Sequence, residues 1–491
     1  MTELKEVTVV KNIDDEVEGR TGRDWSVLRQ HLAALVANLA ALSAGMCLGW
    51  SSPALPLLQR EQDDVDLPLY VTIEEGSWIS CLVPLGATVG SLPVGYLSDY
   101  IGRKKTILSL AIPYIVGWML ILFSDTSLTL MYVGRFIAGL GIGGTTVLVA
   151  QYNEEISEDG IRGALGVYLD SSMSAGVFFV NLLGCFLSYM WFSIVSCIIP
   201  VIFVCTFICM PESPVYLILQ DRMDDAMKSL TWLRKGKNLE DIQSEIDCIK
   251  EHLNKEKAES GSIPFMDRMM EFFGDLSSQS TLLKTAGIVL GLMFLQQVAG
   301  INAILFYTVS IFQSSGSKMS SNMSSTIVAG CMAASEFCSS FYVDRWGRRP
   351  MLLFSTLVTA VCLAVLSAYF HYNDNNYDVS SWNWVPITAL IIYVITYTAG
   401  FSQLPWLLTA ELVPSKHQKW INPMASFLSW GMAFVLTKEF PDMQIYLGND
   451  VSYGIFSSTS IASFIFIWFL VPETNGKSRE EIQDSLRGNR K

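Results

Sequence analysis

The stretch GLMFLQQVAGINAILFY, residues 291–307, places two glutamines and an asparagine inside an apolar run. If this run crosses a membrane, each amide loses water, which costs about 1–3 kcal/mol for every unpaired group. A straight helix would hold Gln297 and Asn302 about 140° apart. They can face one ligand only if the helix is broken or rotated near Gly300, and glycine tolerates such a break. We therefore expect a discontinuous span that binds a neutral, polyhydroxylated solute at mid-membrane.

The composition of the chain is that of a polytopic membrane protein. Of its 491 residues, 51% are hydrophobic and 16% are charged, against about 25% charged in soluble domains. The first 30 residues are polar and lack the apolar core of a removable signal peptide. The formal net charge of −13 is spread over loops and tails, which argues against binding to nucleic acid. Nine of the ten cysteines lie in apolar runs, so we predict neither disulfides nor a metal site.

Hydropathy predicts an all-α membrane protein with twelve transmembrane helices in two six-helix bundles. With about 20 apolar residues per crossing, the spans centre near residues 41, 86, 115, 139, 176, 200, 298, 333, 361, 398, 430 and 462. The long gap after the sixth span divides the chain. The expected parts are an N-terminal tail (1–30), an N-terminal bundle (31–210), a helical linker (211–283), a C-terminal bundle (284–471) and a C-terminal tail (472–491).

The distribution of basic residues predicts the orientation of the chain. Loops after even-numbered spans carry nine lysines and arginines, against three after odd-numbered spans. Basic loops face the cytoplasm, so we expect both termini and the linker to be cytosolic, in a plasma-membrane protein. Asn322-Met323-Ser324 is then the only outward-facing glycosylation sequon, although its place at the mouth of span eight weighs against its use.

The two halves repeat one another in order. DYIGRK at 99–104 recurs as DRWGRR at 344–349, Glu155 is answered by Glu411, and PES at 211–213 recurs as PET at 472–474. The offsets are 245, 256 and 261 residues. Charged loop ends alone would explain the charges but not the matched spacing, so we interpret the chain as a duplicated, pseudo-symmetric bundle.

The linker contains an amphipathic helix. Within the strongly charged residues 221–259, apolar side chains recur at steps of three and four: Leu239, Ile242, Ile246, Ile249 and Leu253. We expect this stripe to pack under the bundle. A groove on a partner protein is the alternative.

The chain resembles the sugar porter family of the major facilitator superfamily over essentially its whole length. Six motifs in order carry the resemblance: GRF at 134–136 with Gly139, Gly141 and Gly143; Tyr152 with Glu155, Arg162 and Gly163; PESP at 211–214; QQ at 296–297 with GIN at 300–302; PW at 405–406 with Glu411; and PET at 472–474. GWSSP at 49–53 looks like the branch that contains insect trehalose and hexose facilitators.

The resemblance implies a central cavity, a mid-membrane sugar site and alternating access. Gln296, Gln297 and Asn302 would bind sugar hydroxyls, and Trp406 would offer a ring face to the sugar. An ordinary core aromatic is the alternative for Trp406. The outer gate would be formed by Phe306 and Tyr307.

The chain also departs from the family at three positions. The usual glutamine of span five is Asp170, an asparagine of span eight is Met332, and the asparagine before the span-eleven tryptophan is Ser429. The second half of the site has therefore lost amide partners, and its sugar preference should differ from that of a typical glucose carrier.

Two acids lie inside the predicted membrane region. Asp170 follows Arg162 by eight residues and Glu336 precedes Asp344 by eight, so each is about 12 Å along its helix from the membrane surface. Such a carboxylate marks a functional site by default. For Asp170 we favour sugar-hydroxyl binding or proton coupling over a structural hydrogen bond, and for Glu336 the reverse.

Charged motifs at the expected cytosolic ends predict a latch. The resemblance implies ion pairs that hold the outward-facing state shut and break on opening; a solvated loop rim is the alternative. The latch residues are Asp99, Arg103, Arg135, Glu155 and Arg162 in the first half, and Asp344, Arg345, Arg348 and Glu411 in the second.

These features favour a passive sugar carrier over other classes. Proton-coupled sugar porters commonly place an aspartate on span one, and residues Leu32 to Ser51 contain no acid. A proton-coupled symporter that uses Asp170 and a non-transporting sugar receptor are the alternatives. With no phosphate-binding glycine loop and no catalytic constellation, we expect neither an enzyme nor a cofactor. The expected partners are a small neutral sugar and the lipid bilayer, with no obligate protein partner.

Overall fold

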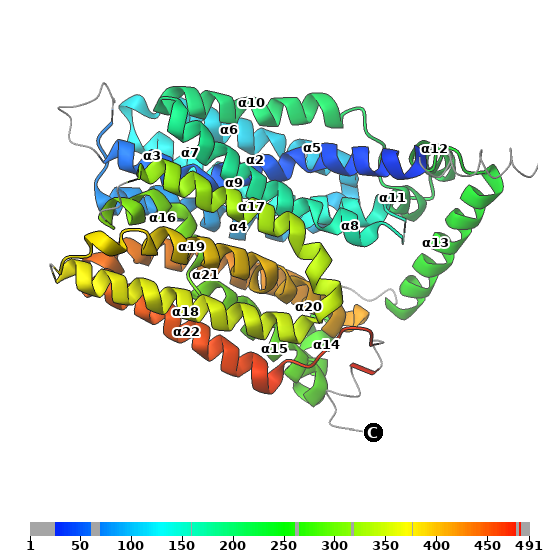
Figure 1. Ribbon diagram of the computed structural model, residues 1–491. Helices are drawn as coiled ribbons and strands as arrows, with labels where there is room; N and C mark the ends of the chain where they lie inside the picture. The colour runs from blue at the N-terminus through cyan, green and yellow to red at the C-terminus, as the bar shows by residue number, and fades with distance from the viewer. Residues whose placement is uncertain are drawn as a thin grey trace, which may run out of the picture.

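The computed structural model describes residues 25–59, 69–158, 160–260, 265–315, 319–375, 377–477 and 481–482. Nearly all of the chain within these ranges is helical, and none of it forms a β-strand. Figure 1 shows long helices that run side by side in two groups, blue to cyan for the first half and green to red for the second. Helices α12 and α13 lie at one end, which we call the linker end.

The first group of helices contains six spans, several of them interrupted. The first is one 34-residue helix, Trp25–Leu58, which includes α2 (Leu39–Gly49) and α3 (Ser51–Leu58). The others are α4 (Ile73–Ile101), α5 (Arg103–Ser109) with α6 (Ala111–Leu122), α7 (Leu128–Ile156), α8 (Arg162–Gly166) with α9 (Tyr168–Phe186), and α10 (Tyr189–Phe207).

The second group repeats this arrangement. It comprises α15 (Ser280–Val298) with α16 (Ile301–Ser314), α17 (Ser321–Trp346), α18 (Arg348–Asp374), α19 (Val385–Thr396) with the π-helix η3 (Tyr397–Ser402) and α20 (Leu404–Leu412), α21 (Ser415–Leu447), and α22 (Asn449–Leu470).

Ten helical spans in the described ranges are long and apolar enough to cross a membrane. The remaining two, α17 and α21, are 26 and 33 residues long and more polar. They pack against helices of the other half, α17 on α9 and α21 on α4. Because they face protein there rather than lipid, they can carry serines, glycines and polar side chains that a lipid-facing span could not.

Glycines allow the helices within a half to approach closely. A Cβ at Gly139 would lie 2.3 Å from the carbonyl oxygen of Val83 in α4, and one at Gly45 would lie 1.9 Å from that of Met173 in α9. Small residues at such contacts are a common way to pack helices in membranes. The glycines of residues 139–144 therefore serve packing.

The linker forms four helices: α11 (Pro214–Leu219), α12 (Met223–Leu233), α13 (Leu239–Ser260) and α14 (Phe265–Ser278). On α13, Ile242 and Ile246 are buried against Tyr216 of α11 and Leu230 of α12. Leu239 does not join them, because its side chain is 71% exposed. The stripe predicted from the sequence thus packs on its neighbouring linker helices.

One end of the linker is anchored to the first half of the chain. Arg234, which is 2% exposed, donates to the carbonyl oxygen of Ile156 at 2.9 Å and pairs with Glu158 and Glu245 at 3.2 and 2.7 Å. Glu158 also accepts a hydrogen bond from Ser26 at 2.8 Å. Burial raises the pKa of Glu158, but the hydrogen bond from Ser26 and the charge of Arg234 outweigh it and hold the pKa below its usual value.

The other end of the linker is anchored to the second half. Lys416 of α21 pairs with Glu271 and Asp275 of α14 at 2.7 and 2.9 Å. The ring of Phe272 stacks on Trp420, with 5.9 Å between the ring centres. The linker therefore contacts both halves through different helices.

Candidate functional site

The polar run that opened the sequence analysis is broken at Gly300. Helix α15 ends at Val298, Gly300 adopts a left-handed conformation with φ of +87°, and α16 begins at Ile301. A Cβ at Gly300 would lie 2.7 Å from a ring carbon of Phe456, so both the backbone and the packing require glycine. This is the break that we expected from the sequence.

The break brings two of the three amides into one hydrogen-bonded chain. Asn302 Nδ2 donates to Gln297 Oε1 at 2.5 Å, and Gln297 Nε2 donates to Ser429 Oγ on α21 at 2.8 Å. Gln297 is 8% exposed, whereas Asn302 is half-buried. Gln297 and Asn302 thus lie together, and Ser429, where the resemblance led us to expect an asparagine, supports them.

Gln296 lies on the other side of α15 and faces the π-helix η3. Its Nε2 donates to the carbonyl oxygens of Phe401 and Ser402 at 2.9 and 2.6 Å. Gln296 Oε1 is buried and has no hydrogen-bond partner among the described residues. A π-helix leaves carbonyl groups displaced from the regular ladder, and such bulges are frequent at functional sites. The Gln296 side chain is therefore held through its amide nitrogen, and its amide oxygen is left able to accept a hydrogen bond from a ligand.

Trp406 differs from its neighbours on α20. Its side chain is 40% exposed, whereas Leu404, Pro405 and Leu408 are buried. This exposure does not fit the alternative of an ordinary core aromatic. The contact of its ring with a sugar stays a prediction.

The two predicted gate residues lie in α16, next to a second irregularity of that helix. Tyr307 has non-helical dihedral angles, φ −119° and ψ 16°. Its hydroxyl donates to the carbonyl oxygen of Thr437 at 3.1 Å, and its ring packs on Phe440 with 5.6 Å between centres. Phe306 is 1% exposed. Both rings are packed in this structure, and a gating role stays a prediction.

Direct contacts join the halves at the end opposite the linker. Ser52 Oγ lies 3.2 Å from Ser325 Oγ and accepts a hydrogen bond from the backbone nitrogen of Val309 at 3.3 Å. Cys185 Sγ lies 3.1 Å from Thr326 Oγ1. In Figure 1 this is the end at which α3 and α16 lie. The two halves are therefore tied together at the end away from the linker.

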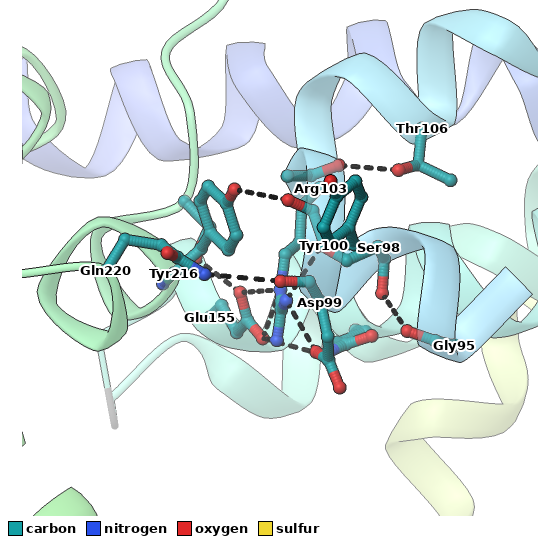
Figure 2. Close-up of polar contacts among 12 residues, drawn as sticks. Gly95, Ser98, Asp99, Tyr100, Arg103, Thr106, Glu155, Tyr216 and Gln220 are labelled. Atoms are coloured by element: carbon teal, nitrogen blue, oxygen red, sulfur yellow. Dashed lines mark hydrogen bonds and ion pairs between the residues drawn. The ribbon is translucent and has the colours of Figure 1, made fainter.

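At the linker end, the first predicted cluster of charges is present (Figure 2). The Arg103 guanidinium donates to both carboxylate oxygens of Glu155 at 3.1 Å and pairs with Asp99 at 2.7 Å. Its charge also lies 5.4 Å from the ring centre of Tyr216. Glu155 accepts a short hydrogen bond from Ser213. The predicted motifs of spans two and four and of the linker thus meet around one arginine.

The second half has a smaller equivalent of this cluster. Arg348 pairs with Glu411 at 3.3 Å, and its backbone nitrogen donates to Glu473 at 3.1 Å. Arg345 is exposed, as is Arg162 in the first half; the side chain of Asp344 lies outside the described residues. Both ion pairs join groups within one half. In this conformation they brace each half, and their role as a latch stays a prediction.

The assignment of Arg135 to this cluster is wrong. Arg135 lies in the first part of α7, far from the linker end, and is fully buried. It donates to the carbonyl oxygens of Ile79 and Cys47 at 3.2 and 2.8 Å and to Ser51 Oγ at 2.8 Å, while its charge lies 5.0 Å from the ring centre of Trp50. Motif order along the chain cannot tell which end of a span a residue occupies, and α7 runs toward the linker end.

The two acids inside the spans lie near one another. Glu336 is 1% exposed, and its Oε1 accepts a hydrogen bond from Gln403 Nε2 at 2.7 Å. Asp170, half-buried in the first turn of α9, is the acidic neighbour whose charge acts on Glu336. Sequence reasoning missed Gln403. Its signal was a glutamine two residues before Pro405 in an apolar run, a pattern like that of the glutamines on span seven.

Asn322, the glycosylation candidate, lies in the first turn of α17. Its Nδ2 is 3.5 Å from the carbonyl oxygen of Gly184, and the sequon residue Ser324 is fully buried. Its modification stays a prediction.

Comparison with known proteins places this arrangement in a family. The chain matches the family described as "Sugar (and other) transporter" over residues 39–486. It is 34% identical over 459 residues to a facilitated trehalose transporter Tret1 of Apis mellifera ligustica, covering 94% of this chain and 88% of that protein. It is 33% identical over 483 residues to Tret1 of Bombyx mori, covering 98% and 92%.

A solved structure agrees with the fold. The inward-open xylose transporter XylE from E. coli matches with a TM-score of 0.74 over 92% of this chain and 98% of XylE. XylE belongs to the major facilitator superfamily. At 19% identity this likeness shows the fold alone, and it confirms the twelve-helix architecture predicted from the sequence. The chain belongs to the sugar transporter family, whose members are carriers rather than enzymes.

Proposed function

We propose that this protein carries trehalose or a hexose passively across the plasma membrane, with both termini and the linker in the cytosol. The observation that carries the proposal is the set of amides at the break in span seven. Gln297 and Asn302 form one chain on Ser429, and Gln296 keeps a free acceptor oxygen. Neutral donors and acceptors of this kind form hydrogen bonds to a sugar in place of the water that it loses, and they carry no charge that would bind an ion.

The sugar-binding roles follow from this geometry. Gln296 Oε1 accepts a hydrogen bond from a sugar hydroxyl, and Asn302 offers the sugar the donor and acceptor groups of its amide that Gln297 does not use. The exposed Trp406 ring covers an apolar face of the sugar. Asp170 accepts hydrogen bonds from sugar hydroxyls where the family usually offers an amide. The relatives whose names specify trehalose support a disaccharide as substrate.

A passive mechanism is supported by the surroundings of Arg135. Its guanidinium donates to two carbonyl oxygens and a hydroxyl, and residues 25–58 of the first span contain no aspartate or glutamate. Proton-coupled sugar porters commonly place an aspartate on span one, near this arginine. The first span offers only neutral partners.

The conformation supports a cytosolic opening. The halves are tied together at the end away from the linker, where Ser52 contacts Ser325. The excess of basic residues in loops at the linker end places that end in the cytosol. We therefore assign this structure to the inward-facing part of the cycle, with Phe306 and Tyr307 on the closed side.

The test is uptake by the purified protein in proteoliposomes. Labelled trehalose, glucose and fructose are supplied with and without an inward proton gradient. We expect trehalose or a hexose to reach equal concentrations on both sides, with no dependence of the end point on the gradient. Accumulation above equilibrium would overturn the passive mechanism, and absence of uptake of all three sugars would overturn the substrate assignment.

A further inference from the structure

Two helices from different halves, α9 and α17, lie antiparallel with a well-defined register. Asn322 of α17 contacts Gly184 of α9, and Ser325 contacts Asn181. Each step of three residues forward on α17 is matched by a step of three backward on α9. Continuing this register by eleven residues brings Glu336 opposite Asp170. This register agrees with Asp170 being the acidic group whose charge acts on Glu336.

The Glu336 carboxyl group is held rigidly but only half satisfied. Its Oε1 accepts from Gln403 Nε2 at 2.7 Å, and Gln403 Oε1 in turn accepts from Ser339 Oγ at 2.8 Å. Glu336 Oε2 is buried and has no hydrogen-bond partner among the described residues. Gln403 thus fixes one oxygen of the carboxyl group and leaves the other without a hydrogen-bond partner among the described residues.

No basic side chain in the described ranges forms an ion pair with either acid. Helix η3 contributes Tyr397 to the surroundings of Glu336, and α17 itself contributes the exposed Cys338. Near Asp170, Tyr168 is bonded to His31 at 2.8 Å, and Arg162 is exposed two turns away on α8. Two neighbouring carboxylates away from bulk water cannot both stay ionised.

We propose that Asp170 and Glu336 form one proton-binding site that straddles the two halves. The site binds one proton, which removes the repulsion between two negative charges and so favours the packing of α9 on α17 in this conformation. The proton is taken from water at the open end of the bundle. When α9 and α17 move apart, the two acids ionise independently and the proton returns to water. The balance between the two conformations then shifts by up to tenfold per pH unit, although no sugar gradient is driven.

The direct test is infrared difference spectroscopy on the full chain in proteoliposomes, which requires no transported sugar. A protonated carboxylic acid has a carbonyl band distinct from that of carboxylate. We expect a pH-dependent protonated band in the wild type that is lost in both Asp170→Asn and Glu336→Gln. Asp225→Asn, which removes an exposed acid on α12, should leave the band unchanged. Glu336→Gln keeps an acceptor for Gln403, and Asp170→Asn places an amide at a half-buried position.

The functional readout is the rate of equilibrium sugar exchange at equal pH on both sides. The wild-type rate should vary with pH, and the profile should flatten in both variants. A protonated band that is absent from the wild type, or that survives in either variant, overturns the proton site. Failure of sugar uptake in the wild type would overturn the substrate assignment. The proton site would still be tested by the infrared result, which does not depend on sugar.

Discussion

Arg135 shows how a permanent charge is accommodated inside a helical bundle. Its side chain is fully buried, and its partners are two carbonyl oxygens, one hydroxyl and the face of Trp50. Arginine offers five donors in a planar fork, whereas lysine offers a compact ammonium group. The site therefore selects the shape of arginine as much as its charge.

Arg135→Lys should destabilise the protein. Hydrogen bonds to a charged group contribute about 1.5–3 kcal/mol each, and a lysine cannot reach Ile79, Cys47 and Ser51 together. We expect a lower thermal midpoint in detergent, measured by size-exclusion chromatography after heating. Arg222→Lys, at an exposed pair with Asp225, is the control and should leave the midpoint unchanged. An unchanged midpoint for Arg135→Lys would contradict this account of the buried charge.

Asn302 ends the hydrogen-bonded chain that runs through Gln297 to Ser429, so its loss should weaken sugar binding. Asn302→Ala removes the 2.5 Å hydrogen bond to Gln297 and the amide itself. A net loss of about 1 kcal/mol corresponds to a KM for sugar uptake roughly fivefold higher. Asn375→Ala, at the exposed end of α18, is the matched control. Equal KM values for the two variants would show that Asn302 does not contribute to sugar binding.

At the scale of elements, the break between α15 and α16 sets the orientation of the amides. Gly300→Ala introduces a Cβ at φ +87°, which costs about 1–2 kcal/mol in backbone energy, and the Cβ would meet the Phe456 ring at 2.7 Å. We expect reduced thermal stability and reduced sugar uptake. Gly287→Ala, in α15 with nothing within 4 Å of an added Cβ, should be neutral or slightly stabilising. Equal effects of the two changes would show that the break is not required.

The elements that could be predicted from the sequence are those with a strong local signal. Ten spans have the length and hydropathy of a membrane helix, and the count of apolar runs also placed spans near residues 333 and 430, where α17 and α21 lie. The glycine between two polar residues predicted the break at Gly300. The π-helix at Tyr397–Ser402 has no such local signal, and the side chain that donates to its carbonyl groups is Gln296, 105 residues from Phe401 in sequence.

Long-range contacts account for what the sequence did not predict in the site. Gln403 and Glu336 are 67 residues apart, and their hydrogen bond exists only once α17 packs against η3, which ends beside Gln403. The misplacement of Arg135 has the same origin, since a span must be oriented before a motif can be assigned to one of its ends. The duplicated ion pairs were easier to predict because each includes residues at the ends of spans.

At the scale of the whole molecule, the linker contacts both halves, and one of these contacts should depend on pH. Glu158 has a pKa below its usual value in the folded chain. Its contribution to the docking of α12 and α13 is therefore complete above the ordinary value of 4.5 and is lost as the pH falls through the lower folded value. We expect faster proteolysis of the linker below about pH 4.5. In Glu158→Gln, linker proteolysis should be faster at neutral pH and should depend less on pH than in the wild type. If the variant keeps the wild-type pH dependence of proteolysis, a group other than Glu158 causes it.

Alternating access requires the end away from the linker to open, and the structure offers a way to hold it closed. Cys185 Sγ on α9 lies 3.1 Å from Thr326 Oγ1 on α17, so the two side chains are close enough for Thr326→Cys to form a disulfide across the halves. Oxidation should then abolish nearly all sugar uptake by preventing α9 and α17 from separating, and a reducing agent should restore it. Cys185→Ser combined with Thr326→Cys is the control that cannot form this bond and should be insensitive to oxidant. Full uptake by the oxidised, cross-linked protein, with the bond confirmed by mass spectrometry, would show that α9 and α17 remain together throughout transport.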